Sequence, residues 1–443
     1  MRAEWTTHSL GDLCEFINGF AFKSTDYIPN SSETVEVFRM GYIARGGGFK
    51  EDGSPVFVPR NYDRDLTRFR LHRDDIAIAM TDMKDRVAIL GNTAWIRQSD
   101  RFVLNQRVGC IRVKRKDLVD ARFLYYYSNW QPYVRDLRSR ANSGVQVNLS
   151  TSAIKESEIL LPPFLEQKGI AAVLGALDDK IELNRRMNAT LEAIARTLFQ
   201  SWFVNFDPVR AKLDGRQPTS LDPATAALFP NEFENSELGR IPRGWTVEPV
   251  GQVVDCVGGA TPSTSEPKYW SNGTHHWTTP KDFSALQAPI LLDTDRKLTD
   301  AGVAKISSGL LPAGTLLLSS RAPVGYLAIA AMPVAINQGF IAMKCNERAS
   351  NFFMLNWCQA NMAEIEGRAT GTTFAEISKQ NFRPIPVVLP PKEVMAAFTP
   401  KISPLYAQIT ANLRQSRALA ILRDTLLPAL LGGRLSPLRE LND

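Results

Sequence analysis

One short stretch contains residue types found at a catalytic site. Leu161-Pro162-Pro163-Phe164 matches the Pro-Pro-aromatic part of the motif used by amino-methyltransferases. It lacks the Asp, Asn or Ser that would precede the prolines and accept a hydrogen bond from the target amine. No glycine-rich strand-turn-helix for S-adenosylmethionine comes before it. We therefore interpret the stretch as the entry to a helix and not as an active site.

Two other patterns could suggest metal or nucleotide chemistry. Glu266-Pro267-Lys268 matches half of a nuclease metal motif, but no strand with an Asp precedes it, so it predicts a turn. His275-His276 has no further ligand at metal spacing. The sequence contains no G-x-x-x-x-G-K-[ST] phosphate loop, so we expect no ATP site. The sequence predicts no catalytic residue, no metal site and no cofactor bound by the chain itself.

Basic side chains offer a different chemistry, the binding of nucleic acid. Guanidinium and ammonium groups neutralise phosphates or donate hydrogen bonds to guanine O6 and N7. A run of five arginines in the first part of the chain suits that role: Arg60, Arg64, Arg68, Arg70 and Arg73. The alternative is a solvated face on which four carboxylates balance them: Asp63, Asp65, Asp74 and Asp75. Both interpretations stay open.

Further contact candidates are single residues with polar or basic side chains. Amides suit adenine, although a buried turn amide is the alternative. The candidates before residue 155 are Thr81, Lys84, Arg86, Asn105, Gln106 and Gln146. Those after residue 245 are Thr261, Ser263, Lys281, Arg321, Gln338, Arg368, Thr372 and Thr373.

The charge of the chain is unevenly placed. The 443 residues carry a net charge of +6, and residues 1–155 alone, with 24 Lys/Arg against 18 Asp/Glu, account for +6. Residues 245–390 carry 11 of each sign. A polyanionic partner fits this excess, and simple solubility fits it equally. Five scattered cysteines without a C-x-x-C pair, together with no visible targeting or membrane segment, favour a reducing cytoplasm.

One long amphipathic stretch, Glu166 to Trp202, organises these candidates. Its apolar residues recur at steps of four and three, the a/d seam of a coiled coil, and two asparagines interrupt them. The seam comprises Ile170, Leu174, Leu177, Ile181, Asn184, Asn188 and Leu191. The same pattern recurs at an offset of 228, as Phe398, Ile402, Leu405, Ile409, Asn412 and Leu419. We interpret the two helices as partners; the alternative is two helices that each pack on a separate domain.

The globular segments are duplicated as well. Trp5 and Gly11 match Trp245 and Gly251 at an offset of 240, and Gly144 matches Gly371 at 227. Leu104-Asn105-Gln106 is repeated as Ile336-Asn337-Gln338 at an offset of 232. Changing offsets are what loop insertions and deletions produce. We expect an α+β protein with domains at 1–155 and 245–390, helical regions at 156–206 and 391–435, and a linker at 207–244.

This order of segments resembles the specificity subunit of type I restriction-modification systems, over essentially the whole chain. The Asn-Gln pairs and three phrases carry the resemblance. The phrases are Leu161-Pro162-Pro163 leading into Glu166-Gln167-Lys168-Gly169-Ile170-Ala171, Phe199-Gln200-Ser201-Trp202-Phe203-Val204-Asn205-Phe206-Asp207-Pro208-Val209, and Leu238-Gly239-Arg240-Ile241-Pro242-Arg243-Gly244-Trp245. The loop from Thr81 to Arg86 also resembles one seen in some members.

The resemblance implies a pseudo-twofold protein, in which two target-recognition domains are separated by two helices forming an antiparallel coiled coil. Each domain would read one half of a bipartite target in double-stranded DNA. The implied partners are two methyltransferase subunits and, in the restricting form, translocase-nuclease (restriction) subunits. They would bind the S-adenosylmethionine, ATP and Mg needed for adenine methylation and restriction, while this chain would be non-catalytic.

The helix length suits such a role. A helix of roughly 32 residues is about 48 Å long, which exceeds one DNA turn of about 34 Å. Two alternatives stay open: a coiled-coil adaptor that binds only proteins, and a free-standing methyltransferase or nuclease. Salt-sensitive binding to one bipartite duplex would exclude the first, and an inactive isolated chain would exclude the second.

Overall fold

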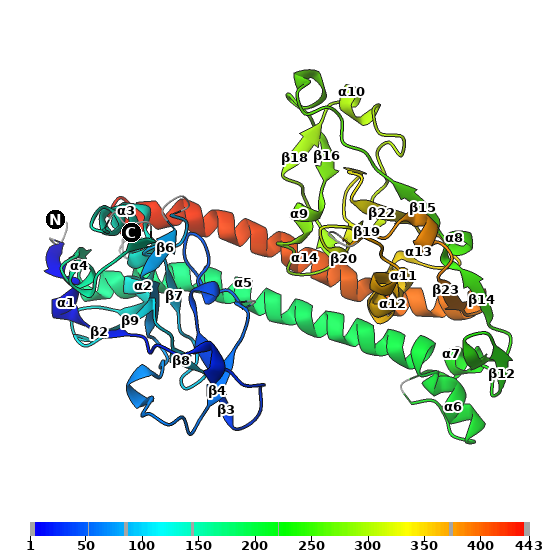
Figure 1. Ribbon diagram of the computed structural model, residues 1–443, viewed down its shortest axis with the longest axis horizontal. Helices are drawn as coiled ribbons and strands as arrows, with labels where there is room; N and C mark the ends of the chain where they lie inside the picture. Colours follow the sequence, from blue (N-terminus) through cyan, green and yellow to red (C-terminus); the bar gives the residue numbers. More distant parts are fainter. Residues whose placement is uncertain are drawn as a thin grey trace, which may run out of the picture. The chain divides into compact units, whose positions relative to one another are not determined.

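The computed structural model describes residues 5–51, 53–83, 87–142, 146–219, 221–371 and 375–437. It forms two compact units: the first unit comprises Met1–Lys180 and Leu419–Asp443, and the second unit comprises Ile181–Ala418. Two long helices, α5 (Phe164–Phe199) and α14 (Lys392–Leu431), each contribute residues to both units (Figure 1). No helix of the described residues is long and apolar enough to cross a membrane.

The first unit is built on two small sheets. The antiparallel sheet has the order β2-β9-β5-β7: β2 (Cys14–Asn18), β9 (Val108–Val113), β5 (Ile76–Ala79) and β7 (Thr93–Trp95). The mixed sheet has the order β4-β3-β8: β4 (Phe57–Pro59), β3 (Thr34–Phe38) and β8 (Phe102–Leu104). Two strand pairs complete it: β1 (Thr6–Ser9) with β11 (Glu158–Leu161), and β6 (Thr81–Met83) with β10 (Gln146–Asn148).

The second unit repeats this plan. Its larger sheet has the order β15-β22-β19-β20-β17: β15 (Asp255–Gly258), β22 (Phe340–Lys344), β19 (Leu316–Ser320), β20 (Val324–Ala330) and β17 (Ile290–Leu291). Its three-stranded sheet has the order β18-β16-β21: β18 (Arg296–Leu298), β16 (His275–Thr278) and β21 (Val334–Ile336). Strand β14 (Thr246–Pro249) pairs with β23 (Pro386–Leu389), and β12 (Phe233–Ser236) with β13 (Gly239–Pro242).

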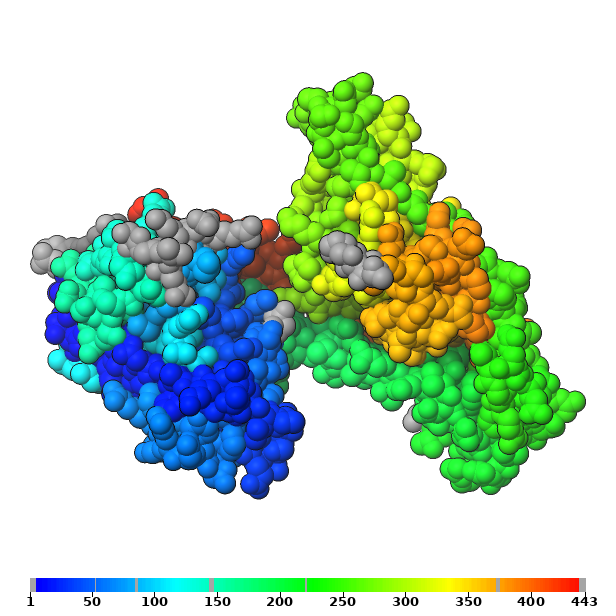
Figure 2. Space-filling model, viewed as in Figure 1, coloured from blue at the N-terminus to red at the C-terminus, as the bar shows by residue number. Residues whose placement is uncertain are grey.

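Short helices connect the strands. Those of the first unit are α1 (Leu10–Leu13), α2 (Ala121–Asn129), α3 (Gln131–Ser139) and α4 (Thr151–Lys155), with 3₁₀ turns η1 (Ser24–Asp26), η2 (Met40–Tyr42) and η3 (Thr67–Phe69). Those of the second unit are α6 (Asp207–Leu213), α7 (Pro223–Ala227), α8 (Val250–Val253), α9 (Pro280–Phe283), α10 (Asp300–Val303), α11 (Asn351–Ala360), α12 (Met362–Gly367) and α13 (Lys379–Phe382), with the π turn η5 (Gln200–Val204) and the 3₁₀ turn η6 (Pro267–Tyr269). The segment from α11 to α13 forms part of the surface of the second unit, in yellow and orange (Figure 2). This mixture of helices and strands confirms the predicted α+β class.

The strand register follows the sequence offsets. Thr6 pairs with Leu161 in the first unit, and Thr246 pairs with Leu389 in the second, which are the same positions at offsets of 240 and 228. The three-stranded sheets also correspond, because β3 runs parallel to β8 and β16 runs parallel to β21. Both units therefore share one backbone frame.

The two long helices pack against each other. In the second unit, Asn412 Nδ2 donates to Asn188 Oδ1 (2.9 Å), and Asn184 Nδ2 donates to Gln415 Oε1 (2.9 Å). Beyond the end of α5, the Trp202 ring contacts the Phe398 ring, so the two helices run in opposite directions. The seam side chains are buried at Ile170, Leu174, Asn184, Asn188, Phe398, Ile402, Ile409 and Asn412, and half-buried at Leu177, Ile181, Leu191, Leu405 and Leu419.

The segment predicted as a linker has its own packed structure. It forms α6, α7 and the β12–β13 hairpin. Phe229 is buried, and its ring lies edge-on to the ring of Trp202 after α5, with centroids 5.1 Å apart. Trp245, which begins the second domain, is also buried in this aromatic cluster. Aromatic burial therefore fixes residues 223–245 against the end of α5.

Candidate nucleic-acid interface

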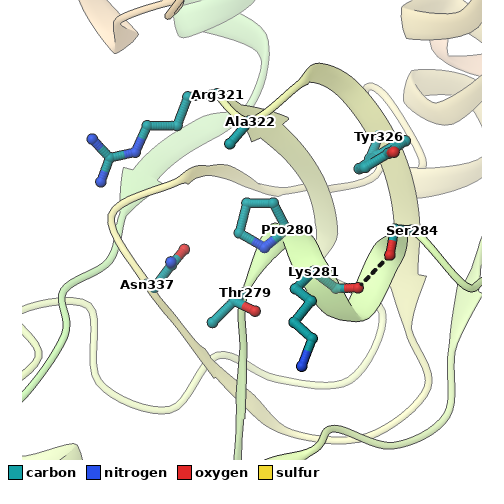
Figure 3. A pocket seen from close by; sticks show the side chains of 8 residues that line it. All are labelled: Thr279, Pro280, Lys281, Ser284, Arg321, Ala322, Tyr326 and Asn337. Carbon is teal, nitrogen blue, oxygen red and sulfur yellow. Dashed lines mark hydrogen bonds between the residues drawn. The ribbon is translucent and has the colours of Figure 1, made fainter. Parts of the chain in front are cut away.

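A cavity of about 430 Å³ lies in the second unit (Figure 3). It is lined by Thr279, Pro280, Lys281, Ser284, Arg321, Ala322, Tyr326 and Asn337. Most of these residues come from segments that follow β16, β19 and β21, so the loop ends of both sheets meet here. The cavity brings together two of the sequence candidates, Lys281 and Arg321, which come from separate segments of the chain.

Local hydrogen bonds fix the first wall of this cavity. Thr279 begins α9 with a capping box, in which Asp282 Oδ2 accepts from the Thr279 backbone N–H at 2.7 Å. The Ser284 hydroxyl donates to the Lys281 carbonyl at 2.8 Å. The Lys281 ammonium group extends into solvent, with 84% of its side chain exposed, and lies 3.6 Å from Asp295. A lysine exposed in this way can reach a phosphate.

The turn after β21 forms the second wall. The Asn337 backbone N–H donates to the Thr278 carbonyl, and Asn337 Oδ1 accepts from the Gly339 N–H at 2.9 Å. Gln338 is exposed, and its Oε1 accepts from the Thr261 hydroxyl at 2.6 Å. Gly259 allows the close approach, since a Cβ there would lie 1.9 Å from the Ile336 carbonyl oxygen. Thr261 and Gln338 therefore lie together, as neighbours of the cavity wall.

The other candidates of the second unit lie apart from the cavity lining. The Ser263 hydroxyl pairs with that of Ser265 at 2.9 Å. Arg368 is held by Glu364 one helical turn before it, with Nε 2.6 Å from the carboxylate. Thr372 and Thr373 lie outside the described residues.

The first unit has the same turns, and Gly19, Asn105 and Gln106 stand where Gly259, Asn337 and Gln338 stand in the second unit. Gly19 approaches the Asn105 carbonyl oxygen as Gly259 approaches that of Ile336. Asn105 Oδ1 is buried and, among the described residues, has no hydrogen-bond partner. Gln106 is exposed. Thr81 is not exposed as a DNA-contact residue would be, because it is buried and its hydroxyl donates to Met40 Sδ at 3.2 Å.

Three candidate side chains of the first unit lie outside the described part of the chain. Two of them belong to Lys84 and Arg86. The third belongs to Gln146, whose backbone pairs with Met83 in the β6–β10 ladder.

The five arginines of the basic run have different surroundings. Arg60 is exposed after β4, and Arg68 lies in η3. Arg70 is half-buried, and its carbonyl accepts from Arg112 at 3.1 Å. Arg73 lies 3.9 Å from Asp74. Arg64 differs in that its guanidinium lies 6.0 Å from the Phe20 ring centroid, and Phe20 pairs with Asn105 in a backbone bridge. Of the five arginines, Arg64 is therefore the one that these contacts place beside the Asn105 turn.

The sequence argument missed two residues of the second unit. Asn337 corresponds to Asn105 at the offset of 232, and that correspondence could have found it. Glu376 lies 3.6 Å from Arg321, through an ion pair between segments that are far apart in the chain. No local pattern marks such a partner.

The described residues offer little for catalysis. They contain no group of three or more His, Cys, Asp or Glu able to hold a metal ion. Burial raises the pKa of the Cys14 thiol to about 12, and that of Cys256 to about 11, so both stay protonated and are poor nucleophiles. Exposed donors and amides at loop ends suit hydrogen bonding to a ligand rather than a covalent reaction.

Known proteins are similar to this chain in sequence, and a solved structure is similar in fold. The specificity subunit of the type I restriction enzyme HindI of Haemophilus influenzae is 26% identical over 354 residues, covering 71% of this chain and 76% of that protein. The putative MjaX specificity subunit of Methanocaldococcus jannaschii is 21% identical over 447 residues, covering 98% and 94%. The crystal structure of a type I restriction-modification S subunit from M. genitalium matches with a TM-score of 0.57 at 14% identity, over 96% of each chain.

A family comparison covers most of the chain. The family described as the type I restriction modification DNA specificity domain matches residues 2–193 and 242–416. These two segments coincide with the two copies of the duplicated frame. The chain therefore belongs to the type I restriction-modification DNA specificity family, as the subunit that recognises DNA and not as one of the enzymes of such a system.

Proposed function

We propose that each unit reads one half of a bipartite DNA target, and that the paired helices set the distance between the two halves. The observation that supports this best is the shared frame with different loop side chains. Thr81 and Asn148 in the first unit stand where Arg321 and Glu376 stand in the second. Equal frames present equal groove-facing loops, and different side chains read different bases.

The helices also supply a surface for partners. On α5 in the second unit, Leu183, Met187 and Ile194 are 48%, 36% and 49% exposed, and their spacing places them on one face. An exposed apolar stripe on a helix fits another helix of a partner protein. We assign this stripe to one of two methyltransferase subunits.

The partners would supply the chemistry that this chain lacks. Methyltransferase subunits would bind S-adenosylmethionine, and restriction subunits would bind ATP and Mg. The chain would direct adenine methylation and restriction in the cytoplasm, where its target DNA lies. The pure chain is then expected to show no methyl transfer, nuclease or ATPase activity.

Exchange of one domain tests the proposal. Residues 1–155 are replaced by the first domain of another family member, and the hybrid is assembled with the methyltransferase subunits. Mapping of methylated adenines in a host genome should show one changed half-site and one unchanged half-site. A change of both half-sites together would show that the units do not read independently. Failure of the wild-type complex to bind any bipartite duplex would support the adaptor alternative.

A further inference from the structure

Arg321 and Glu376 form a cross-strand pair at the cavity of the second unit. Their backbones pair in an isolated antiparallel bridge. Arg321 Nη1 lies 3.6 Å from Glu376 Oε2, and the two side chains are 36% and 47% exposed. The guanidinium is therefore oriented by a carboxylate while part of both groups stays open to solvent.

The same position in the first unit has other side chains. Thr81 pairs with Asn148 there, and these residues match Arg321 and Glu376 at the offsets of 240 and 228. The neighbouring backbone bonds also match. Leu149 N–H donates to the Met80 carbonyl, as Ile377 N–H donates to that of Ser320. The two units therefore share the backbone at this position and differ in its side chains. A position that sets sequence preference must vary in this way.

The pair is complementary to the edge of one base pair. An arginine donates to guanine O6 and N7, and a carboxylate accepts from cytosine N4. Within a G·C pair, guanine O6 and cytosine N4 are hydrogen-bonded to each other, at about 2.9 Å. The 3.6 Å between the Arg321 and Glu376 atoms is close to this spacing. The Arg321 donor would thus face guanine O6, which is an acceptor, and the Glu376 acceptor would face cytosine N4, which is a donor.

A backbone phosphate suits this site less well. The Glu376 carboxylate offsets the charge of Arg321 and would repel a phosphate placed beside it. We propose that Arg321 and Glu376 together read one G·C base pair in the half-site of the second unit. This assignment rests on the function proposed above and names the bases that this part of the site takes.

The test uses the full chain assembled with its methyltransferase subunits. Duplexes carry each of the four base pairs at every position of the mapped second half-site. Arg321→Ala should lower the preference for guanine at one position by about 5- to 150-fold and leave the other positions unchanged. Glu376→Gln, which keeps the side-chain size, should weaken discrimination at the same base pair. Lys281→Ala is the control, expected to weaken binding to all sequences alike.

A DNA-side experiment with the wild-type protein avoids any folding defect of the variants. Each guanine of the second half-site is replaced by 7-deazaguanine, which lacks N7, and binding should fall at the position that Arg321→Ala relaxes. A second half-site without any G·C pair, equal weakening across all sequences in Arg321→Ala, or unchanged discrimination would overturn the inference. Absence of any bipartite target for the wild-type complex would instead refute the proposed function.

Discussion

Asn412 and Asn188 face each other between α14 and α5, where they are 4% and 3% exposed. Asn412 Nδ2 donates to Asn188 Oδ1 at 2.9 Å, and Asn412 Oδ1 accepts from Gln408 Nε2 at 2.8 Å. Asn412→Leu would leave the Asn188 oxygen buried without this donor. Such an orphan costs about 1–3 kcal/mol. Replacing both asparagines by Leu removes donor and acceptor together, which should be nearly neutral.

Thermal unfolding measures this difference. For a unit of this size, 1 kcal/mol shifts Tm by about 2–4 °C, so Asn412→Leu should lower the transition of the second unit by about 2–12 °C. Asn188→Leu should lower it similarly, and the double variant should unfold within about 3 °C of the wild type. Ala411→Leu is the control, because that position is exposed on the same helix.

The double variant also tests the role of the asparagines. A buried asparagine restricts helix register at a cost in stability. The double variant should therefore stay folded while the complex accepts targets with more than one gap length. A double variant whose Tm falls by the sum of the two single effects would show that the asparagines are not coupled, and the reasoning would be wrong.

Two further variants have defined outcomes. Burial raises the pKa of Glu192 from 4.5 to about 7, with Arg196 opposing the shift. Between these values the folded chain keeps a proton that the unfolded chain has lost, so Glu192 lowers stability as pH rises from 4.5 to about 7, and no further above that. Glu192→Gln should remove this part of the pH dependence of Tm, and equal slopes in both proteins would contradict it. Met187→Glu should reduce co-purification of methyltransferase subunits without lowering Tm. Thr190→Glu, on the same exposed face, serves as a comparison and should reduce co-purification less. Unchanged assembly in Met187→Glu would exclude the stripe as a docking surface.

Repetition made the fold predictable. The seam spacing and the offset of 228 indicated two similar helices, and the structure buries Ile170, Asn184, Ile409 and Asn412 along them. The residues that surround a site could not be found this way. Glu376 reaches Arg321 only because its segment forms a backbone bridge just after the end of β19. The five arginines are close in sequence, but β4, a loop and η3 give each of them different neighbours.

The two units differ where each globular part meets the helices. In the first unit, Arg122 donates to Asp179 at 2.8–2.9 Å, and the Tyr126 hydroxyl donates to Asp178 at 2.7 Å. The residue that corresponds to Asp178 at the offset of 228 is Tyr406, whose ring stacks on Phe352 with centroids 5.0 Å apart. Charged contacts in one copy are therefore replaced by an aromatic contact in the other.

This contrast sets a condition for exchanging domains. The carboxylates of α5 stay in place when residues 1–155 are replaced, so the incoming domain must supply donors where Arg122 and Tyr126 stand. A domain without them would leave Asp179, which is about half exposed, with water instead of a guanidinium, at a cost of no more than about 1 kcal/mol. Asp178 is 15% exposed and also binds Arg423 at 2.7 Å, so losing the tyrosine there would leave one partner rather than none. Domain exchange should therefore be tolerated at this contact, and a changed half-site can be attributed to the loops that read DNA.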